Sequence, residues 1–435
     1  MTVDLTLVDS LTGLVQDALE RESTSRAVEG LSPLSRDAKE ALADSVLRRQ
    51  FEVMDIDGIA SGRRRLSSAE EIDIAKRVIA RAIGLGPIEV LLADPTVEEI
   101  VATRFDIVLV YRSNGSVELV GERLWRSEAD LDAWLSHLAR TAGRTERQFN
   151  SQVPMLVMRL GDGLRLAATR DVSQHVSFSI RRNTLGKVTL DELVAMDMFP
   201  VEVADLLRAC MRSTEIRIVF SGTTGSGKST AVRACLSALD PLARVVIIED
   251  TAELDFFDAR ERPNVESWEE RLPNNEGEGA VTQGQQVKHA LRYRPDWLVC
   301  GEVRDSDAAV PMLKAMTHGQ SSLTTVHAAT AQGALDKLAL YLGTGEDRLP
   351  PEVAHNQLYQ AVDFVVHLDR LPDGRRVVQE VLEVSGFDGR RCTTNTIVQT
   401  DEDGTVRTMQ RLEQRHVRAL RRAGFDELTL GGAWR

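Results

Sequence analysis

Short, mostly apolar runs recur in the second half of the chain, and stretches with helical character lie between them. Runs without polar alternation are typical of strands buried on both faces, as in a parallel sheet covered by helices. These runs are Ile216–Phe220, Val245–Ile248, Trp297–Cys300 and Leu323–Val326. The pattern therefore predicts an α/β domain with a mainly parallel sheet.

The first half of the chain changes pattern twice. It begins with helical periodicity, and Ser67 with Glu70, or Ser68 with Glu71, has the spacing of a helix-starting capping box. Alternating strands then flank turn signals such as Asn114-Gly115, which predicts a small antiparallel α+β domain. The predicted division is a helical region at 1–83, the α+β domain at 84–183, a linker at 184–199 and the α/β domain at 200–435.

A glycine-rich segment follows the first apolar run and reads Ser-Gly-Thr-Thr-Gly-Ser-Gly-Lys-Ser from Ser221 to Ser229. Strand, glycine loop and helix in this order are the context of a phosphate-binding loop, whose backbone N–H groups point at phosphate oxygens. Lys228 is expected to reach the β- and γ-phosphates of a nucleoside triphosphate, and Ser229 to bind Mg²⁺. The predicted nucleotide-binding residues are Gly222, Thr223, Thr224, Gly225, Ser226, Gly227, Lys228, Ser229 and Thr230.

Acidic residues and a histidine follow the other three apolar runs. Glu249, Asp250 and Glu253 follow the second run, Glu302 the third and His327 the fourth. Ligands of an open α/β sheet collect at the carboxyl ends of its strands, so these residues are candidates for the chemistry. Asp250 and Glu302 are the acids predicted to lie at the metal. Solvated strand-end carboxylates and a structural histidine are the alternatives.

The composition narrows the class of function. The chain has 435 residues, of which 43% are hydrophobic and 27% charged, and no apolar stretch approaches bilayer-spanning length. A net charge of −13 argues against nucleic acid as the main partner. The four cysteines are scattered, which excludes zinc-ribbon spacing and indicates reduced thiols in the cytosol. The chain also lacks the Asn-Lys-x-Asp element of GTPases and the Leu-Ser-Gly-Gly signature of ABC transporters.

The four clusters, in this order and spacing, resemble those of the secretion-type ATPases that power type II, type IV and pilus machines. In that family they are called the Walker A motif, Asp box, Walker B motif and His box. The chain is most similar to the CpaF/TadA branch, the motor of tight-adherence (Tad, Flp-type) pili. The resemblance covers about residues 70–425 and includes the segments Gly84–Ile100 and Ile180–Arg182.

This resemblance implies a RecA-like nucleotide domain with ATP and Mg²⁺ as cofactors. Glu302, with Glu249 and Glu253, is implied to polarise the attacking water, and His327 to couple hydrolysis to movement. The arginines implied to reach the nucleotide from the small domain are Arg165, Arg181 and Arg182. For each arginine, an ordinary surface salt bridge is the alternative.

The resemblance also implies a homo-oligomer, a hexamer, in the cytoplasm. It is expected to associate peripherally with the inner membrane and to act on platform proteins of a pilus or secretion system, without direct contact to nucleic acid. Two other classes stay open. A conjugative, DNA-translocating ATPase would have the same core and DNA-stimulated turnover, whereas a nucleotide-gated regulator would assemble on nucleotide with little phosphate release.

Overall fold

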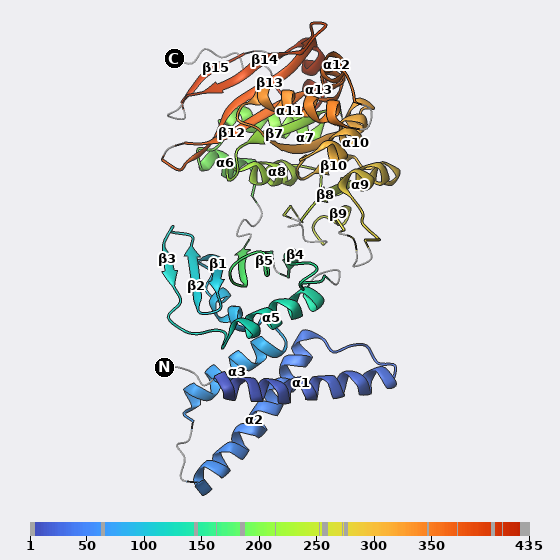
Figure 1. Cartoon of the computed structure of the whole chain (residues 1–435). Coiled ribbons are helices and arrows are strands. Elements are labelled where there is room, and N and C mark those ends of the chain that lie inside the picture. The colour runs from blue at the N-terminus through green and yellow to red at the C-terminus, as the bar shows by residue number, and fades with distance from the viewer. Residues whose placement is uncertain are drawn as a thin grey trace. The chain divides into compact units, whose positions relative to one another are not determined.

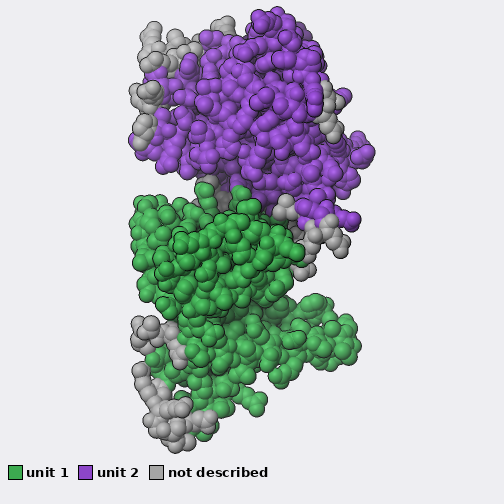
Figure 2. Space-filling view, in the orientation of Figure 1, with its two compact units in different colours: residues 1–184 green, residues 185–435 purple. Residues whose placement is uncertain are grey.

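The computed structural model describes most of the chain and divides it into two compact units. Unit 1 comprises residues 1–184 and unit 2 residues 185–435, as coloured in Figure 2. Each unit has hydrophobic cores of its own. The described residues are 5–61, 66–142, 147–161, 163–182, 188–213, 215–251, 253–254, 260–271, 273, 277–345, 348–371, 373–401, 405–410 and 412–426.

Unit 1 contains a six-stranded antiparallel sheet with the order β3-β2-β1-β6-β5-β4. Helix α5 (Glu128–Thr141) packs on it, because Leu131 and Leu135 share a core with Ile100 and Ile180 of the strands. The turn at Gly115, where φ is 83°, joins two antiparallel strands as predicted. The strands are β1 (Val97–Arg104), β2 (Ile107–Arg112), β3 (Val117–Leu119), β4 (Met155–Leu160), β5 (Leu164–Thr169) and β6 (Ser177–Arg182).

Three helices precede this sheet in unit 1. Val8, Leu47 and Val78, one from each helix, are buried in a common core. Of the two predicted capping boxes, the one at Ser67 and Glu70 is confirmed: Glu70 N–H donates to Ser67 Oγ at 3.3 Å, and Ser67 N–H donates to Glu70 Oε2 at 2.8 Å. The helices are α1 (Leu5–Val28), α2 (Arg36–Ser61) and α3 (Ser68–Ala82), followed by the short helices η1 (Gly86–Ile88) and α4 (Glu89–Leu92).

Unit 2 is built on a nine-stranded sheet with the order β15-β14-β13-β12-β7-β11-β10-β8-β9 (Figure 1). The strands from β12 to β9 pair in parallel, whereas β13, β14 and β15 extend one edge in antiparallel fashion. The strands are β7 (Arg217–Gly222), β8 (Val245–Glu249), β9 (Val265–Glu269), β10 (Trp297–Cys300), β11 (Ser322–His327), β12 (Phe364–Arg370), β13 (Arg376–Phe387), β14 (Cys392–Thr400) and β15 (Val406–Met409).

Helices cover both faces of this sheet, so its central strands are buried on both sides. Ile218 and Phe220 of β7 share one core with α7, α8 and α13, and Val219 between them lies in a second core with α9 to α12. This arrangement confirms the predicted α/β class and explains why the strands read as mostly apolar runs without regular polar alternation. The helices are α7 (Val201–Arg212), α8 (Lys228–Ser237), α9 (Gln283–Ala290), η2 (Leu291–Tyr293), α10 (Ser306–Thr317), α11 (Ala331–Thr344), α12 (Pro351–Ala361) and α13 (Gln414–Arg422).

The stretch predicted as a linker contains a helix, α6 (Leu190–Ala195). Thr189 and Glu192 form a second capping box at its start, and Leu190 and Leu193 are buried in the core of unit 2. Residues 184–187 of the predicted linker lie outside the described residues. The described part of this stretch therefore packs as an element of unit 2.

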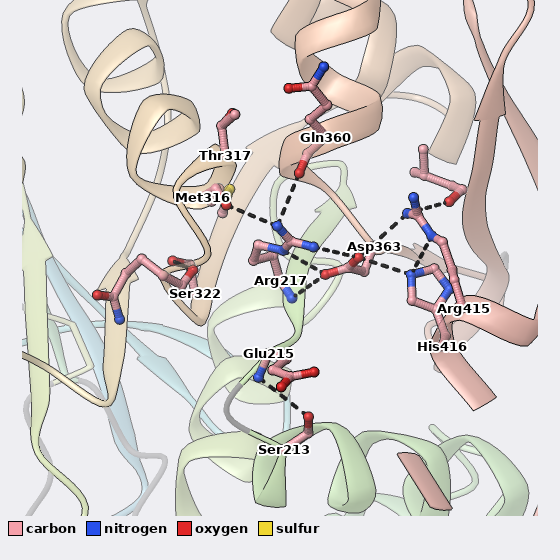
Figure 3. A network of polar contacts seen from close by, with 12 residues as sticks. Ser213, Glu215, Arg217, Met316, Thr317, Ser322, Gln360, Asp363, Arg415 and His416 are labelled. Carbon is pink, nitrogen blue, oxygen red and sulfur yellow. Dashed lines mark hydrogen bonds and ion pairs between the residues drawn. The ribbon is translucent and has the colours of Figure 1, made fainter. Parts of the chain in front are cut away.

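A buried polar network lies at the amino ends of β7 and β12 (Figure 3). Arg217 donates from Nε and Nη2 to the two carboxylate oxygens of Asp363, at 2.7 and 2.8 Å. His416 of α13 places Nε2 2.9 Å from Asp363 Oδ1 and Nδ1 2.5 Å from Glu383 Oε1. Burial raises the pKa of Asp363, but hydrogen bonds from His416 and Arg217 outweigh this and hold that pKa below its ordinary value. The network attaches α13 to the strand that ends in the glycine loop.

The helices of the chain bear on membrane insertion, and its cysteines bear on thiol reactivity. Among the described residues, none of the helices has the length and apolarity needed to cross a membrane. All four cysteines are buried free thiols, and burial raises the pKa of each: Cys210, Cys235, Cys300 and Cys392. These thiols therefore stay protonated at neutral pH.

Candidate nucleotide site

The glycine-rich segment forms a tight loop between β7 and α8. Gly225 and Gly227 have φ values of 78° and 99°, in the left-handed region that favours glycine. At Gly222, where φ is 149°, a Cβ atom would lie only 2.3 Å from the backbone oxygen of Leu368. Helix α8 then starts at Lys228, so the N–H groups of its first turn face the loop. This is the backbone shape that binds phosphate groups at a helix N-terminus.

Lys228 lies folded over this loop and is 8% exposed. Its Nζ atom donates to the backbone oxygens of Gly222 at 3.0 Å and Thr223 at 2.8 Å, and lies 3.2 Å from His327 Nδ1. Burial lowers the pKa of Lys228, and the negative charges of Glu302 and Glu253 partly oppose that effect. An anion that replaced the two carbonyl oxygens would therefore relieve the cost of burying this ammonium group.

Two serine hydroxyls of the loop are suited to a nucleotide with its metal ion. Ser226 Oγ is buried and, within the described part of the chain, has no hydrogen-bond partner. Ser229 Oγ is only weakly engaged, at 3.5 Å from Glu253 Oε2. Thr223, Thr224 and Gly225 are exposed at the tip, and Thr230 is buried in the first turn of α8. These residues fit a bound triphosphate with Mg²⁺.

The strand-end acid Glu302 lies beside Lys228 and His327. Glu302 Oε1 is 3.0 Å from His327 Nε2, and His327 Nδ1 is 3.2 Å from the Gly222 oxygen. On the other side, Arg304 donates to Glu302 Oε2 from Nε at 2.9 Å and Nη2 at 2.8 Å, and also forms an ion pair with Asp250. Asp250, predicted at the metal, is thus joined to Glu302 through a guanidinium group.

Glu249 has a different environment from Glu302. It is 3% exposed, and its carboxylate accepts N–H bonds from Glu253 at 3.0 Å and Leu254 at 3.1 Å. Burial raises the pKa of Glu249 to about 8. Gly301 makes room for this side chain, since a Cβ atom there would lie 2.7 Å from Glu249 Cγ. Glu249 therefore shapes the turn that carries Glu253, while Glu253 itself lies next to Ser229.

The three predicted arginines belong to unit 1. Arg165 of β5 and Arg181 of β6 are directly opposite each other, and Arg159 of β4 is opposite Arg165. Directly paired residues lie on the same face of a sheet, so three guanidinium groups line up across three strands. Arg182 instead donates to the backbone oxygens of Leu92 and Asp94, which ties it to its own unit.

Three residues near the predicted site residues were not among the predictions: Arg304, Arg159 and His367. Arg304 follows Glu302 at a spacing of two, which is a visible signal for an ion pair at a strand end. Arg159 joins the arginine row only through strand register, and His367 approaches the glycine loop from β12. Neither of these two placements could be read from local sequence, because each depends on pairing between distant segments.

Known proteins are similar to this chain in sequence and in fold. Conjugal transfer protein TrbB of Rhizobium radiobacter is 32% identical over 234 residues, which are 53% of this chain and 67% of that protein. A putative conjugal transfer protein of Mycobacterium tuberculosis is 30% identical over 325 residues, 71% of this chain and 86% of that protein. Type IV secretion system protein VirB11 of Bartonella henselae is 28% identical over 225 residues, 48% of this chain and 59% of that protein.

Solved structures with a similar fold include an ATPase and a pilus retraction motor. The ATPase DotB of Legionella pneumophila superposes with a TM-score of 0.51 at 17% identity, covering 69% of this chain and 80% of DotB. The pilus retraction motor PilT with bound ADP gives 0.50 at 20% identity, covering 68% of this chain and 82% of PilT. Residues 82–432 match the family described as Type II/IV secretion system protein. The chain belongs to this family of secretion ATPases.

Proposed function

We propose that the chain hydrolyses ATP with Mg²⁺ and uses the energy to drive assembly or export by a pilus or secretion system of the type IV or Tad kind. The conformation of residues 222–228 carries this proposal. It combines left-handed glycines, a buried hydroxyl without a partner at Ser226, and an ammonium group held by carbonyl oxygens alone on its loop side. Together these groups bind a triphosphate.

In this proposal each residue at the carboxyl edge of the sheet has its own task. Ser229, Asp250 and Glu302 would hold Mg²⁺, which would offset charge on the phosphates. Lys228 exchanges its carbonyl contacts for phosphate oxygens. Glu302 orients and deprotonates the attacking water, and His327 connects Glu302 to Lys228 through its two ring nitrogens, at 3.0 and 3.2 Å.

Substitution of Lys228 by alanine tests nucleotide hydrolysis directly. We expect phosphate release with Mg–ATP to fall by about 100-fold or more, because the charge on the transferred phosphoryl group loses its fixed cation. Circular dichroism should show an unchanged fold. Lys288→Ala, which removes an exposed lysine of α9 in the same unit, is the matched control and should keep wild-type turnover. Retained turnover in Lys228→Ala would overturn the proposal.

The arginine row of unit 1 supports a motor whose site is completed by movement. Arg165 and Arg181 are proposed to neutralise nucleotide charge from outside the phosphate-loop unit, either within one subunit or between neighbours of a hexamer. Arg182, which is bound to backbone oxygens, is assigned the weaker role of bracing that unit. Rigid-body closure would then deliver force to an inner-membrane platform protein, with the ring lying in the cytoplasm against the membrane. The similarity to the CpaF/TadA branch supports the Tad assignment.

A second candidate is a motor that serves conjugation. The observation that favours it is the likeness to proteins described as conjugal transfer proteins, at 30% and 32% identity. Turnover measured with and without added DNA separates the two functions: stimulation by DNA favours a DNA-translocating motor, and stimulation only by platform protein favours the pilus or secretion motor. The net charge of −13 opposes extensive DNA contact.

A further inference from the structure

The hairpin formed by β12 and β13 starts beside the phosphate loop. Strand β12 pairs in parallel with β7, and its residue Leu368 is opposite Gly222 of the loop. The two are so close that a Cβ atom at Gly222 would lie 2.3 Å from the Leu368 backbone oxygen. On the returning strand, Val378 N–H donates to the backbone oxygen of Met198 at 2.9 Å. Both strands of the hairpin are therefore anchored where the loop begins.

Arg376, the first residue of β13, packs on the phosphate loop itself. A Cβ atom at Gly227 would lie 3.4 Å from Arg376 Cδ and 2.6 Å from Met198 Cε. Gly227 is the N-cap residue of α8, with a φ of 99°, and it directly precedes Lys228. The stem of this exposed arginine thus lies at the point where the phosphate-binding N–H groups begin.

The positive charge of Arg376 is not neutralised by a neighbouring acid. Arg376 and Arg370 are directly opposite each other in the antiparallel pair of β13 and β12, so both lie on one face of the sheet. Within the part of the chain that the structure describes, neither guanidinium group takes part in a hydrogen bond or an ion pair. Like charges directly opposite each other destabilise a sheet, so a bound anion would relieve this arrangement. The adjacent Arg375 differs, because its Nε donates to Asp373 Oδ2 at 2.7 Å.

The strand order determines which end of a nucleotide Arg376 faces. Glu302 and Asp250 follow β10 and β8, which lie on one side of β7, whereas Arg376 belongs to β13 on the other side. Hydrolysis takes place at the γ-phosphate, so that phosphate faces the acids. Arg376 therefore faces the phosphates that remain in ADP.

We propose that Arg376 binds the α- and β-phosphates of the nucleotide from the hairpin, with Arg370 adding positive charge beside it. This inference rests on the proposed function of the site. A guanidinium group donates several N–H bonds in a fixed plane, which matches the oxygens of a phosphate group. The phosphate chain is then bound by Lys228 and the loop on one side and by Arg376 on the other.

Arg376→Met tests this contact, since it keeps an unbranched stem over Gly227 and removes the charge. We expect the Kd values for Mg–ADP and for Mg–ATP to rise by a similar factor, about 10-fold or more, because both nucleotides lose the same charged hydrogen bonds. Calorimetric titration measures both values. Arg375→Met, at the neighbouring arginine that pairs with Asp373, is the matched control and should change neither Kd by more than about twofold.

The thermal midpoint without nucleotide gives a readout that is independent of turnover. In Arg376→Met it should stay at the wild-type value or rise, because repulsion between Arg376 and Arg370 is removed. A purely structural role for Arg376 would lower this midpoint. Arg376→Lys, which keeps the charge but loses the planar group, should bind Mg–ADP more tightly than Arg376→Met and more weakly than wild type.

The outcomes are distinct from those that test the proposed function. Wild-type protein that binds neither Mg–ATP nor Mg–ADP would remove the proposed function itself. Wild-type binding with unchanged Kd values in Arg376→Met would overturn the role of Arg376 alone. A rise in Kd for Mg–ATP but not for Mg–ADP would also overturn it, since Arg376 would then contact the γ-phosphate. If Arg376→Met does not fold, Arg376→Gln carries the same comparison.

Discussion

At the scale of single residues, Glu302 and Glu249 show how environment separates two carboxylates at neighbouring strand ends. Glu302 is held from the side by Arg304 and His327, and it lies next to Lys228, where a water molecule could be activated. Glu249 is turned inward onto backbone N–H groups. The two acids were predicted together from sequence as groups that polarise water. The geometry favours Glu302 for that task.

Glu302→Gln should separate nucleotide binding from hydrolysis. We expect kcat to fall by about 100-fold or more, since an amide cannot accept the proton of the attacking water, with little change in the Kd for ATP. Radiolabelled ATP retained on the protein, compared with phosphate released, measures the two properties. Glu352→Gln, an exposed acid in the first turn of α12, is the matched control. Wild-type turnover in Glu302→Gln would show that another residue deprotonates the attacking water.

Glu249→Gln should change how stability depends on pH. Because burial raises the pKa of folded Glu249 to about 8, from an ordinary value of 4.5, the unfolded chain releases this proton first as pH rises. The contribution of protonated Glu249 to the free energy of unfolding is complete below about pH 4.5. It is lost as the pH rises from there to about 8, at up to about 1.4 kcal/mol per pH unit.

Urea denaturation of both proteins measures this effect. The free energy of unfolding of Glu249→Gln, relative to wild type, should rise steadily between pH 5 and pH 8. A difference that stays constant with pH would show that folded Glu249 keeps an ordinary pKa.

At the scale of elements, the sheet of unit 2 is held at both ends of β7. The carboxyl end leads into the phosphate loop, and the amino end is fixed by Arg217, whose guanidinium binds Asp363 and the backbone oxygens of Met316 and Gln360. Through His416 the same network holds α13, whose Val417 and Leu420 pack in the core. Helix α13 and strand β7 are therefore held together by one polar network and one hydrophobic core.

Asp363→Ala should destabilise this group strongly. Its removal leaves Arg217 and His416 buried without their shared anion, and we expect the free energy of unfolding to fall by about 3–5 kcal/mol. Urea denaturation gives the value. Arg418→Ala, an exposed position on the same helix α13, should change stability by less than about 0.5 kcal/mol. A small change in the free energy of unfolding of Asp363→Ala would mean that the network contributes little to stability.

Elements with strong local signals were predictable from sequence. The apolar runs at β7, β8, β10 and β11 and the capping box of α3 are confirmed. Strand β1 was not predicted, because its acidic residues Glu98 and Glu99 interrupt the apolar pattern, and β9 is a half-buried edge strand with no apolar run. At the site, Lys228 and Glu302 follow from motifs, whereas His367 depends on strand order, which local sequence does not encode.

At the scale of the whole molecule, the chain is two units with separate cores, and the chemistry proposed above draws on both. The phosphate loop and the acids are in unit 2, and the row of Arg159, Arg165 and Arg181 is in unit 1. The proposed role of these arginines therefore needs a test that removes them and leaves unit 2 unchanged.

The double variant Arg165→Ala, Arg181→Ala tests this division. We expect kcat to fall by about 10-fold or more, because transition-state charge loses two cations, while the rise in thermal midpoint caused by Mg–ATP is retained. Scanning calorimetry and phosphate release measure the two effects. Arg208→Ala, at an arginine of α7 that pairs with Asp205 and Asp191, serves as the control. Wild-type kcat in the double variant would confine the reaction to unit 2.

The burial of all four cysteines has a practical consequence for studying such movement. Reagents that attack thiolates will find none at the surface of the folded chain, so the natural protein already serves as a non-reactive background. One new cysteine on an exposed position of each unit would accept a donor and an acceptor dye. Energy transfer between the dyes, measured with and without Mg–ATP, would then show whether the distance between the two units changes during turnover.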